Sequence, residues 1–355
     1  MSCVIQNIKC PSCLSSDIKF FRTYLTLGHG KRAIYTCQSC HNNFSETKKT
    51  FIENLHTPIQ EIIKVLKART EGLSFNATCR TFSMSKETLS SWEKKFCRLK
   101  IPLKTYALTH KFLSQQLEGD ELYTKVNKNT EPHESEGWTM VIMERASRFI
   151  WELECGKKDE DLFTHVLLNL LDIVKNTGDC TLFTDGERRY GNILFDLCCE
   201  AIIESDNSLS VDPSGSGTDE KFSVNDTPDE QHVLPKNVRV RLKNKGAKHT
   251  KQNKPKYEAP QKEHPETTQN IDNKDIHANH AEGFNSALRR KNSSYRRRTN
   301  TYAKNIPGLQ KTLDIHWIAH NFIVKQFTTQ KVPAVAIGIL VTAFSWSDVF
   351  AIQVF

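Results

Sequence analysis

Apolar residues recur every three or four positions between residues 57 and 97, which is the spacing of one helix face. The pair Thr57-Pro58 fits the start of a first helix, because proline is favoured at the first helical position. A short second helix is expected before the turn at residues 83–85, and Ser85 can cap a third helix. The third helix would bury Leu89, Trp92 and Phe96.

Three short helices with a tight turn before the last are typical of a helix-turn-helix domain, here at residues 51–100. A plain three-helix bundle has the same periodicity and stays an alternative. If the third helix enters the major groove, its outward face is expected to contact DNA. The residues predicted on that face are Lys86, Thr88, Ser91 and Lys95.

The pattern changes after residue 110, where alternating segments predict three strands at residues 118–126, 137–143 and 148–153. A helix at residues 159–176, a short strand at 180–184 and a helix at 192–203 follow. Strands mixed with helices in this order indicate an α/β core with a mixed sheet, whose first part we assign to residues 110–204.

Residues 205–231 are rich in Ser, Asp, Gly and Pro and poor in apolar residues, which predicts a flexible linker or insertion. We expect the core to resume at residues 232–328, with a strand in which Arg239, Arg241 and Lys243 form a basic face. Helices are predicted at residues 277–291 and 309–326. Residues 329–355 form an apolar tail, whose apolar run at 332–344 is too short to span a bilayer.

The chain of 355 residues is long enough for two or three domains. It has 11 cysteines, an odd number, and it does not open on a signal peptide, so we expect no disulfide framework. Two Cys-x-x-Cys pairs lie within residues 1–50, and two such pairs satisfy a tetrahedral zinc ion completely. A structural zinc ribbon is therefore predicted, with the ligands Cys10, Cys13, Cys37 and Cys40. His29 and His41 are possible ligands that this set does not require.

The net charge of +8 is modest, but the basic residues are clustered at 236–256 and 289–304. Clustered cations gain from counterion release on phosphate backbones, so nucleic acid is the expected partner, although a solvated basic loop is the alternative. We expect a cytoplasmic protein that works without a membrane and, if it is bacterial, is associated with the nucleoid.

Three acids occupy positions suited to metal-dependent chemistry on DNA. Asp120 lies in the first core strand, Asp185 follows the fourth, and Glu282 lies on an arginine-rich helix. Phosphoryl transfer often uses two divalent cations held by a few carboxylates. In a chain with 41 acidic residues, ordinary surface acids are the alternative. Glu121 follows Asp120 directly, and strand alternation places the two on opposite faces.

These acids lie in segments that resemble a known family. The segments are Gly-Asp-Glu-Leu-Tyr at 119–123, Phe-Thr-Asp-Gly at 183–186 and the Glu-x-x-Asn-x-x-x-Arg pattern from Glu282 to Arg289. They are similar to Asp-Asp-Glu transposases of bacterial insertion sequences, closest to the insertion sequence one family. The Cys-Pro-x-Cys ribbon, its second pair within residues 37–45 and the tail at 331–346 also resemble that family.

The resemblance implies a ribonuclease-H-like, integrase-type catalytic domain that uses Asp120, Asp185 and Glu282 with Mg²⁺ or Mn²⁺, beside the Zn²⁺ of the ribbon. It implies metal-dependent nicking of element ends at their terminal inverted repeats, strand transfer into target DNA, and work as a homo-oligomer. Further DNA contacts are expected from Asn285, Arg289, Arg290, Arg296, Arg297 and Arg298. The alternatives are an inactive DNA-binding regulator of transposition and a nuclease of the same fold.

Overall fold

A computed structural model describes residues 8–28, 30–128, 131, 134–184, 187, 189–194, 196, 275–296 and 301–354. For residues 238–242, 249–251 and 254–256 it describes the backbone alone. The chain divides into two compact units. Unit 1 comprises Met1–His110, Glu121–Lys158 and His280–Phe355, and unit 2 comprises Lys111–Asp120 and Asp159–Asn279.

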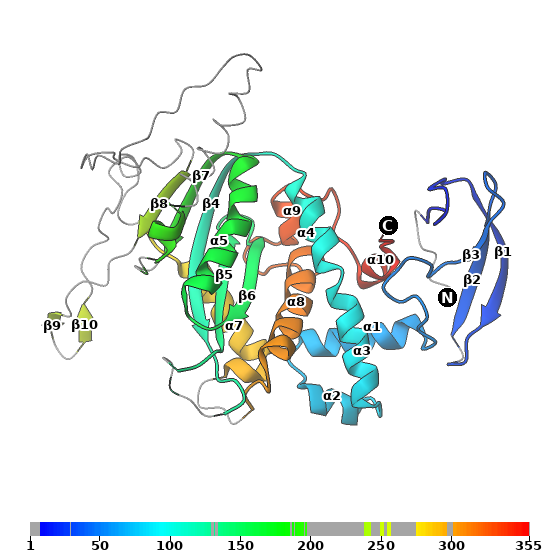
Figure 1. Cartoon of the computed structure of the whole chain (residues 1–355), viewed down its shortest axis with the longest axis horizontal. Coiled ribbons are helices and arrows are strands. Elements are labelled where there is room, and N and C mark those ends of the chain that lie inside the picture. The colour runs from blue at the N-terminus through cyan, green and yellow to red at the C-terminus, as the bar shows by residue number, and fades with distance from the viewer. Residues whose placement is uncertain are drawn as a thin grey trace, which may run out of the picture. The chain divides into compact units, whose positions relative to one another are not determined.

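The first element of unit 1 is a small antiparallel sheet with the order β1-β2-β3 (Figure 1). Its strands are β1 (Ile18–Leu25), β2 (Lys31–Cys37) and β3 (Asn43–Ser45). The core beneath it is very small and consists of Ile8, Cys10, Cys37 and Phe44, with Ile18 and Tyr35 packed against it. Such a core offers little apolar burial to hold the sheet together.

Three helices follow in the predicted order: α1 (Ile59–Thr70), α2 (Phe75–Thr81) and α3 (Lys86–Cys97). The Ser74 and Ser85 hydroxyls cap α2 and α3 by accepting from the N–H groups of Ala77 and Thr88. Gly72 takes a left-handed φ of 104° in the turn between α1 and α2, a conformation that favours glycine. The predicted Ser85 cap and the predicted burial of Leu89, Trp92 and Phe96 are confirmed.

Helix α8 (Ile306–Phe322) is the central helix of unit 1. It contacts β6 (Ile150–Gly156) and the helices α1, α3 and α4 (Lys100–Leu108), as Figure 1 shows. Its Trp317 and Phe322 rings pack with Phe149 in a fully buried aromatic cluster. The Lys100 ammonium of α4 lies between carboxylates of Glu154 on β6 and Asp314 on α8.

The remaining helices of unit 1 are α7 (Asn279–Lys291), α9 (Pro333–Ala336) and α10 (Trp346–Ala351). The apolar run at 332–344 is partly buried around α9, as expected for a tail that packs on the protein. Among the described helices, none has the length and apolar character needed to cross a bilayer.

The larger sheet has five strands in the order β6-β5-β4-β7-β8. Strand β4 (Phe112–Tyr123) passes from unit 2 into unit 1 after Asp120. In unit 2 it pairs in parallel with β7 (Thr177–Thr184), which pairs in parallel with β8 (Val238–Leu242). In unit 1, β5 (Trp138–Glu144) and β6 form an antiparallel pair. The sheet is therefore mixed, as predicted.

Helix α5 (Glu160–Lys175) packs against β7 in unit 2, and the Asp159 carboxylate caps it by accepting from the Leu162 N–H. Residues 189–194 are helical, and β9 (His249–Lys251) pairs with β10 (Lys254–Lys256). Strand β4 begins at Phe112 rather than at the predicted Glu118, because residues 112–118 pair with β7 although their polar composition hides the strand. The predicted linker at 205–231 lies outside the described residues.

Candidate functional site

The two Cys-x-x-Cys segments fold into matching knuckles. In the first, the Leu14 N–H donates to the Cys10 carbonyl at 2.9 Å, and in the second the His41 N–H donates to the Cys37 carbonyl at 2.9 Å. Leu14 and His41 both take left-handed φ values, of 61° and 58°. Such a turn brings the two thiols of each pair to the same side, so each knuckle presents two sulfurs together.

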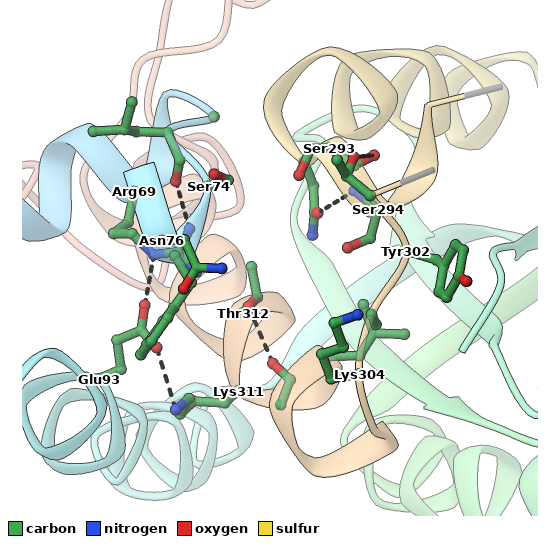
Figure 2. A pocket seen from close by; sticks show the side chains of 18 of the residues that line it. Arg69, Ser74, Asn76, Glu93, Ser293, Ser294, Tyr302, Lys304, Lys311 and Thr312 are labelled. Atoms are coloured by element: carbon green, nitrogen blue, oxygen red, sulfur yellow. Dashed lines mark hydrogen bonds and ion pairs between the residues drawn. The ribbon is translucent and has the colours of Figure 1, made fainter. Parts of the chain in front are cut away.

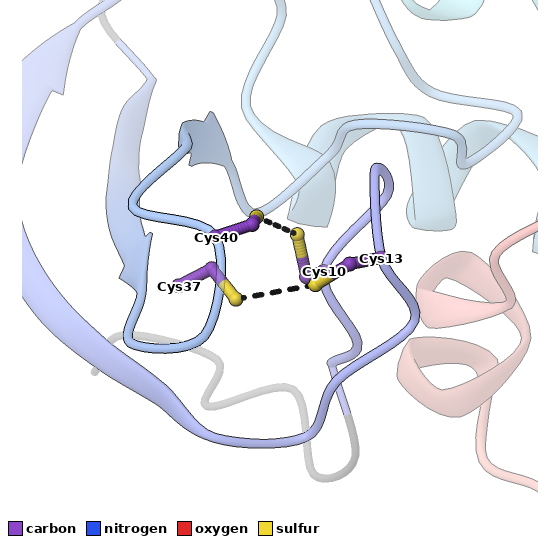
Figure 3. A group of neighbouring side chains, drawn as sticks. All are labelled: Cys10, Cys13, Cys37 and Cys40. Carbon is purple, nitrogen blue, oxygen red and sulfur yellow. Dashed lines mark hydrogen bonds between the residues drawn. The ribbon is translucent and has the colours of Figure 1, made fainter.

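The four sulfurs converge on one point, as Figure 3 shows. The Sγ atoms of Cys10 and Cys40 are 3.5 Å apart, as are those of Cys13 and Cys37, and all four lie within 4.8 Å of one another. Zinc–sulfur bonds of about 2.3 Å in a tetrahedron require sulfur–sulfur distances of about 3.8 Å. A disulfide would need about 2.05 Å. The cluster therefore has the geometry of a four-cysteine zinc site.

The acid–base properties of the thiols also fit a cation. Burial opposes ionisation of Cys37, but N–H donors of Cys40 and Ser39 and the Cys13 thiol outweigh it and lower the Cys37 pKa to about 6. The Ser15 N–H favours the Cys13 thiolate, yet the Cys37 and Cys40 thiols raise the Cys13 pKa to about 12. Neighbouring thiolates repel, so all four can ionise together only around a positive ion.

The histidines of the ribbon are not needed for this site. His41 supplies the left-handed residue that closes the second knuckle, and its side chain is not part of the cysteine group. His29 lies outside the described residues. Four cysteines complete the tetrahedron, which leaves no open position for catalysis.

The first predicted catalytic acid, Asp120, is half-buried near the end of β4. Its neighbour Glu121 forms an ion pair with Lys158, whose Nζ lies 3.1 Å from Oε2. The same ammonium lies 4.4 Å above the Trp138 ring. Glu121 is therefore engaged in a local structural contact within unit 1.

Sequence reasoning missed Glu118, which is fully buried two residues before Asp120 in β4. In unit 2, its Oε1 lies 3.6 Å from Nδ1 of His277, and both groups are potential metal ligands. Residues two apart on a strand share a face, so Glu118 and Asp120 belong to the same face of β4. That alternation was the sequence signal that would have found Glu118, whereas nothing in the sequence paired it with His277.

Of the other two predicted acids, the structure describes Glu282 but not Asp185. Asp185 lies outside the described residues, directly after the end of β7. Glu282 is exposed in the first turn of α7, in unit 1. Convergence of Asp120, Asp185 and Glu282 stays a prediction.

The predicted DNA-facing side of α3 is exposed in part. Lys86 and Ser91 are exposed, and Thr88 is half-buried, with its hydroxyl 3.1 Å from that of Ser85. Lys95 differs from the prediction, because its Nζ donates to the Glu53 carbonyl at 2.9 Å. The long lysine side chain reaches the turn before α1, a contact that helical periodicity does not reveal.

The residues predicted to contact DNA around α7 and β8 also differ in their exposure. Arg290 and Arg296 are exposed and Arg289 is half-buried. Asn285, an expected DNA contact, is only 2% exposed, because α7 buries Ala281, Asn285 and Leu288 together. Arg239 and Arg241 lie on β8, opposite Thr181 and Phe183 of β7 in the backbone register. Lys243, Arg297 and Arg298 lie outside the described residues.

Comparison with known proteins adds no relative. No protein-family model matches the chain, and no curated protein gives a significant match to its sequence.

Proposed function

We propose that this chain is a DNA transposase with a ribonuclease-H-like catalytic core, in which Asp120, Asp185 and Glu282 hold divalent magnesium or manganese. The proposal combines the sequence resemblance with three structural features: a zinc-ribbon geometry, a helix-turn-helix order in α1–α3, and a mixed sheet with β4 at its centre. A fold alone does not define an activity, so the argument depends on the candidate acids.

The pairing of β4 with β7 carries the proposal. The two strands run parallel, and Glu118 is the register partner of Phe183. Asp120 and Asp185 each stand two residues further along the sequence. Acids that leave neighbouring parallel strands at equivalent positions are suited to share metal ions, because adjacent strands lie only about 4.8 Å apart.

The contacts of the neighbouring acids support Asp120 as the first ligand. Glu121 is held by Lys158, and alternation along β4 directs it to the face opposite Asp120. Glu118 shares the Asp120 face and is fully buried beside His277. A buried carboxylate next to an imidazole can orient neighbouring groups, so we assign Glu118 a positioning role for the metal-binding face.

Magnesium, when bound, would lower the pKa of a water molecule and stabilise the oxygen that leaves phosphorus. In the first step, water attacks a phosphodiester at the element end, the phosphorus–O3′ bond breaks, and a 3′ hydroxyl is released. In the second step, that hydroxyl attacks a target phosphodiester and displaces a target 3′ oxygen. Asp120 would hold the cation in both steps, while Lys86 and Ser91 on α3 contact DNA.

Strand transfer in vitro tests this proposal. The zinc-loaded protein is mixed with DNA carrying its own element ends and a supercoiled target in magnesium buffer. We expect joined products, and we expect Asp120→Asn and Glu282→Gln to reduce joining by at least a hundredfold while end binding persists. Asp172→Asn is the matched control, because Asp172 is a largely exposed acid of α5 in unit 2.

Each alternative function has its own outcome. End binding without nicking by the unaltered protein would indicate a DNA-binding regulator. Nicking without joining would indicate a nuclease of this fold. Equal activity of Asp120→Asn and Asp172→Asn would overturn the assignment of Asp120.

A further inference from the structure

A cavity of about 530 Å³ lies within unit 1, and neither the four cysteines nor the predicted acids line it. One wall comes from the end of α1 and the start of α2, including Arg69, Ser74 and Asn76 (Figure 2). The facing wall comes from the segment after α7 and the start of α8, including Ser293, Tyr302 and Lys304. Cavities of this size hold small organic ligands.

Most charged side chains of the lining are cationic, although one of them, Lys291, forms an ion pair with Glu71 at 3.3 Å. The lining contains Arg69, Lys291, Lys304 and Lys311, against a single carboxylate, Glu93. Both oxygens of Glu93 are already engaged, since Arg69 Nε lies 2.6 Å from Oε1 and Lys311 Nζ lies 3.2 Å from Oε2. The Glu93 carboxylate therefore leaves one positive charge on this triad, and an anionic ligand would meet a favourable potential.

Lys304 is the cation most available to a ligand. Its side chain is exposed, and among the described residues no carboxylate forms an ion pair with it. The ammonium lies 5.6 Å from the centre of the Tyr302 ring. Both residues belong to the segment that leads into α8. The cavity thus combines a positive charge and an aromatic surface.

Asn292 gives the second, independent indication of a ligand. Its side chain lines the cavity but is only 6% exposed. The Oδ1 atom accepts from the Ser294 N–H at 3.0 Å, whereas the Nδ2 donor has no hydrogen-bond partner among the residues that the structure describes. A buried N–H without an acceptor is unfavourable, so a ligand that brings an acceptor oxygen would satisfy it.

The start of α8 also favours an anionic ligand. Asn305, Gly308 and Leu309 line the cavity, so the first turn of this 17-residue helix borders it. The N-terminus of a helix carries partial positive charge and favours anions, but the Gly308 N–H already donates to Asn305 Oδ1 at 2.8 Å, so α8 contributes its dipole and not that donor. The hydroxyls of Ser293, Thr301 and Thr312 also line the cavity, and those of Thr301 and Thr312 already donate to the Ser293 and Gly308 carbonyls.

We propose that this cavity binds a nucleotide, with its phosphate near Lys304, Asn292 Nδ2 and the start of α8, and its base against Tyr302. A phosphate alone would leave most of the 530 Å³ unfilled, whereas base and sugar would occupy the remainder. A free nucleotide and a nucleotide of a DNA strand share this chemistry, and the experiment distinguishes the two. The choice of a nucleotide rests on the proposed DNA chemistry, but the cavity and its donors do not.

Calorimetric titration of the full-length, zinc-loaded protein tests this site in buffer without magnesium, where strand transfer cannot proceed. The probes are inorganic phosphate, deoxyadenosine monophosphate and a short single-stranded oligonucleotide with a 5′ phosphate. We expect deoxyadenosine monophosphate to bind more tightly than phosphate. Preference for the oligonucleotide would assign the site to a DNA strand, and equal or weaker oligonucleotide binding would assign it to the free nucleotide.

Two variants and one control locate the binding. Asn292→Asp keeps the Oδ1 acceptor but replaces the donor with a negative oxygen, so we expect loss of binding. Lys304→Gln should weaken it about tenfold, as removal of one charge-assisted hydrogen bond does. Lys325→Gln removes an equally exposed lysine that does not line the cavity, and it should bind normally.

The outcomes separate this site from the proposed transposase activity. If none of the probes binds, or if Lys325→Gln weakens binding as much as Lys304→Gln, the nucleotide site is overturned even when strand transfer succeeds. Phosphate that binds as tightly as the nucleotide would also overturn it. Circular dichroism checks that Asn292→Asp folds, and Lys304→Gln decides the question if it does not.

Discussion

The β1–β3 ribbon with its four-cysteine cluster and the helical core around α8 belong to the same unit but are stabilised differently. In the ribbon, β1 exposes Phe20, Phe21 and Leu25 at 56%, 55% and 65%, and its core contains Ile8, Phe44 and two of the cysteines. Around α8, Phe149, Trp317 and Phe322 are all at 0% exposure. The ribbon thus lacks the apolar burial that stabilises the helices.

Two sources of stabilisation can offset the conformational entropy lost on folding: apolar burial and metal binding. Burial of large rings is favourable in the α8 core, where aromatic centroids lie 5.7 to 6.2 Å apart. In the ribbon, a bound cation linking four sulfurs would supply the stabilisation that its few apolar residues cannot. The two regions should therefore respond to different perturbations.

Zinc removal should produce the largest difference between them. Zinc binding in small fingers is worth about 10–16 kcal/mol near pH 7, so a strong chelator or Cys37→Ser should unfold the ribbon. The helical core should persist. Metal analysis should give one zinc per chain, and amide hydrogen exchange should show protection lost at residues 18–45 alone. Equal loss in α8 would contradict the comparison.

The converse experiment is Phe322→Ala in the aromatic cluster of α8. Truncating a fully buried phenylalanine costs about 3–5 kcal/mol, so the urea midpoint of the helical signal should fall sharply. Zinc content should not change. Phe327→Ala is the matched control, because Phe327 is 92% exposed and its loss should have little effect.

Mild acid should weaken the α8 core through the buried His316 and the half-buried His320. Burial lowers the pKa of His316 to about 3, aided by Lys291 and Arg69, and burial lowers that of His320 to about 4 against a hydrogen bond to the Arg148 carbonyl. Below pH 6.5 the unfolded chain binds protons that the folded chain rejects, so stability falls as pH decreases.

The expected loss is about 2 kcal/mol per histidine between pH 7 and pH 5. Urea midpoints measured at both values check it, and His316→Phe should flatten the dependence, whereas substitution of the exposed His56 by Gln should leave it unchanged. A midpoint that rises on acidification would contradict the direction of these pKa shifts.

The smallest expected effect concerns the cap of α3. The Ser85 hydroxyl accepts from the Thr88 N–H at 3.1 Å, so Ser85→Ala should cost about 1 kcal/mol. Ser91→Ala, an exposed position on the same helix, is the control. Thermal unfolding monitored by circular dichroism measures both, and ribbon protection should remain in each. Equal destabilisation by the two variants would show that the cap is not decisive.

The sequence by itself determined the features that depend on short spacing. Two Cys-x-x-Cys pairs predicted the ligands of the zinc-type cluster, because a knuckle is a local turn. The Ser85 cap and the apolar spacing of α3 predicted that helix for the same reason. Alternation and helical periodicity also predicted the mixed sheet, although β4 begins at Phe112 rather than at the expected Glu118.

Only the tertiary structure decided which distant groups meet. It paired Glu118 with His277, Glu121 with Lys158 and the Lys95 ammonium with the Glu53 carbonyl, and it buried Asn285 on α7. It also formed the cavity in which Asn292 and Lys304 face the end of α1. Such contacts join segments that are separated along the chain, and they depend on packing and side-chain length, which periodicity does not encode.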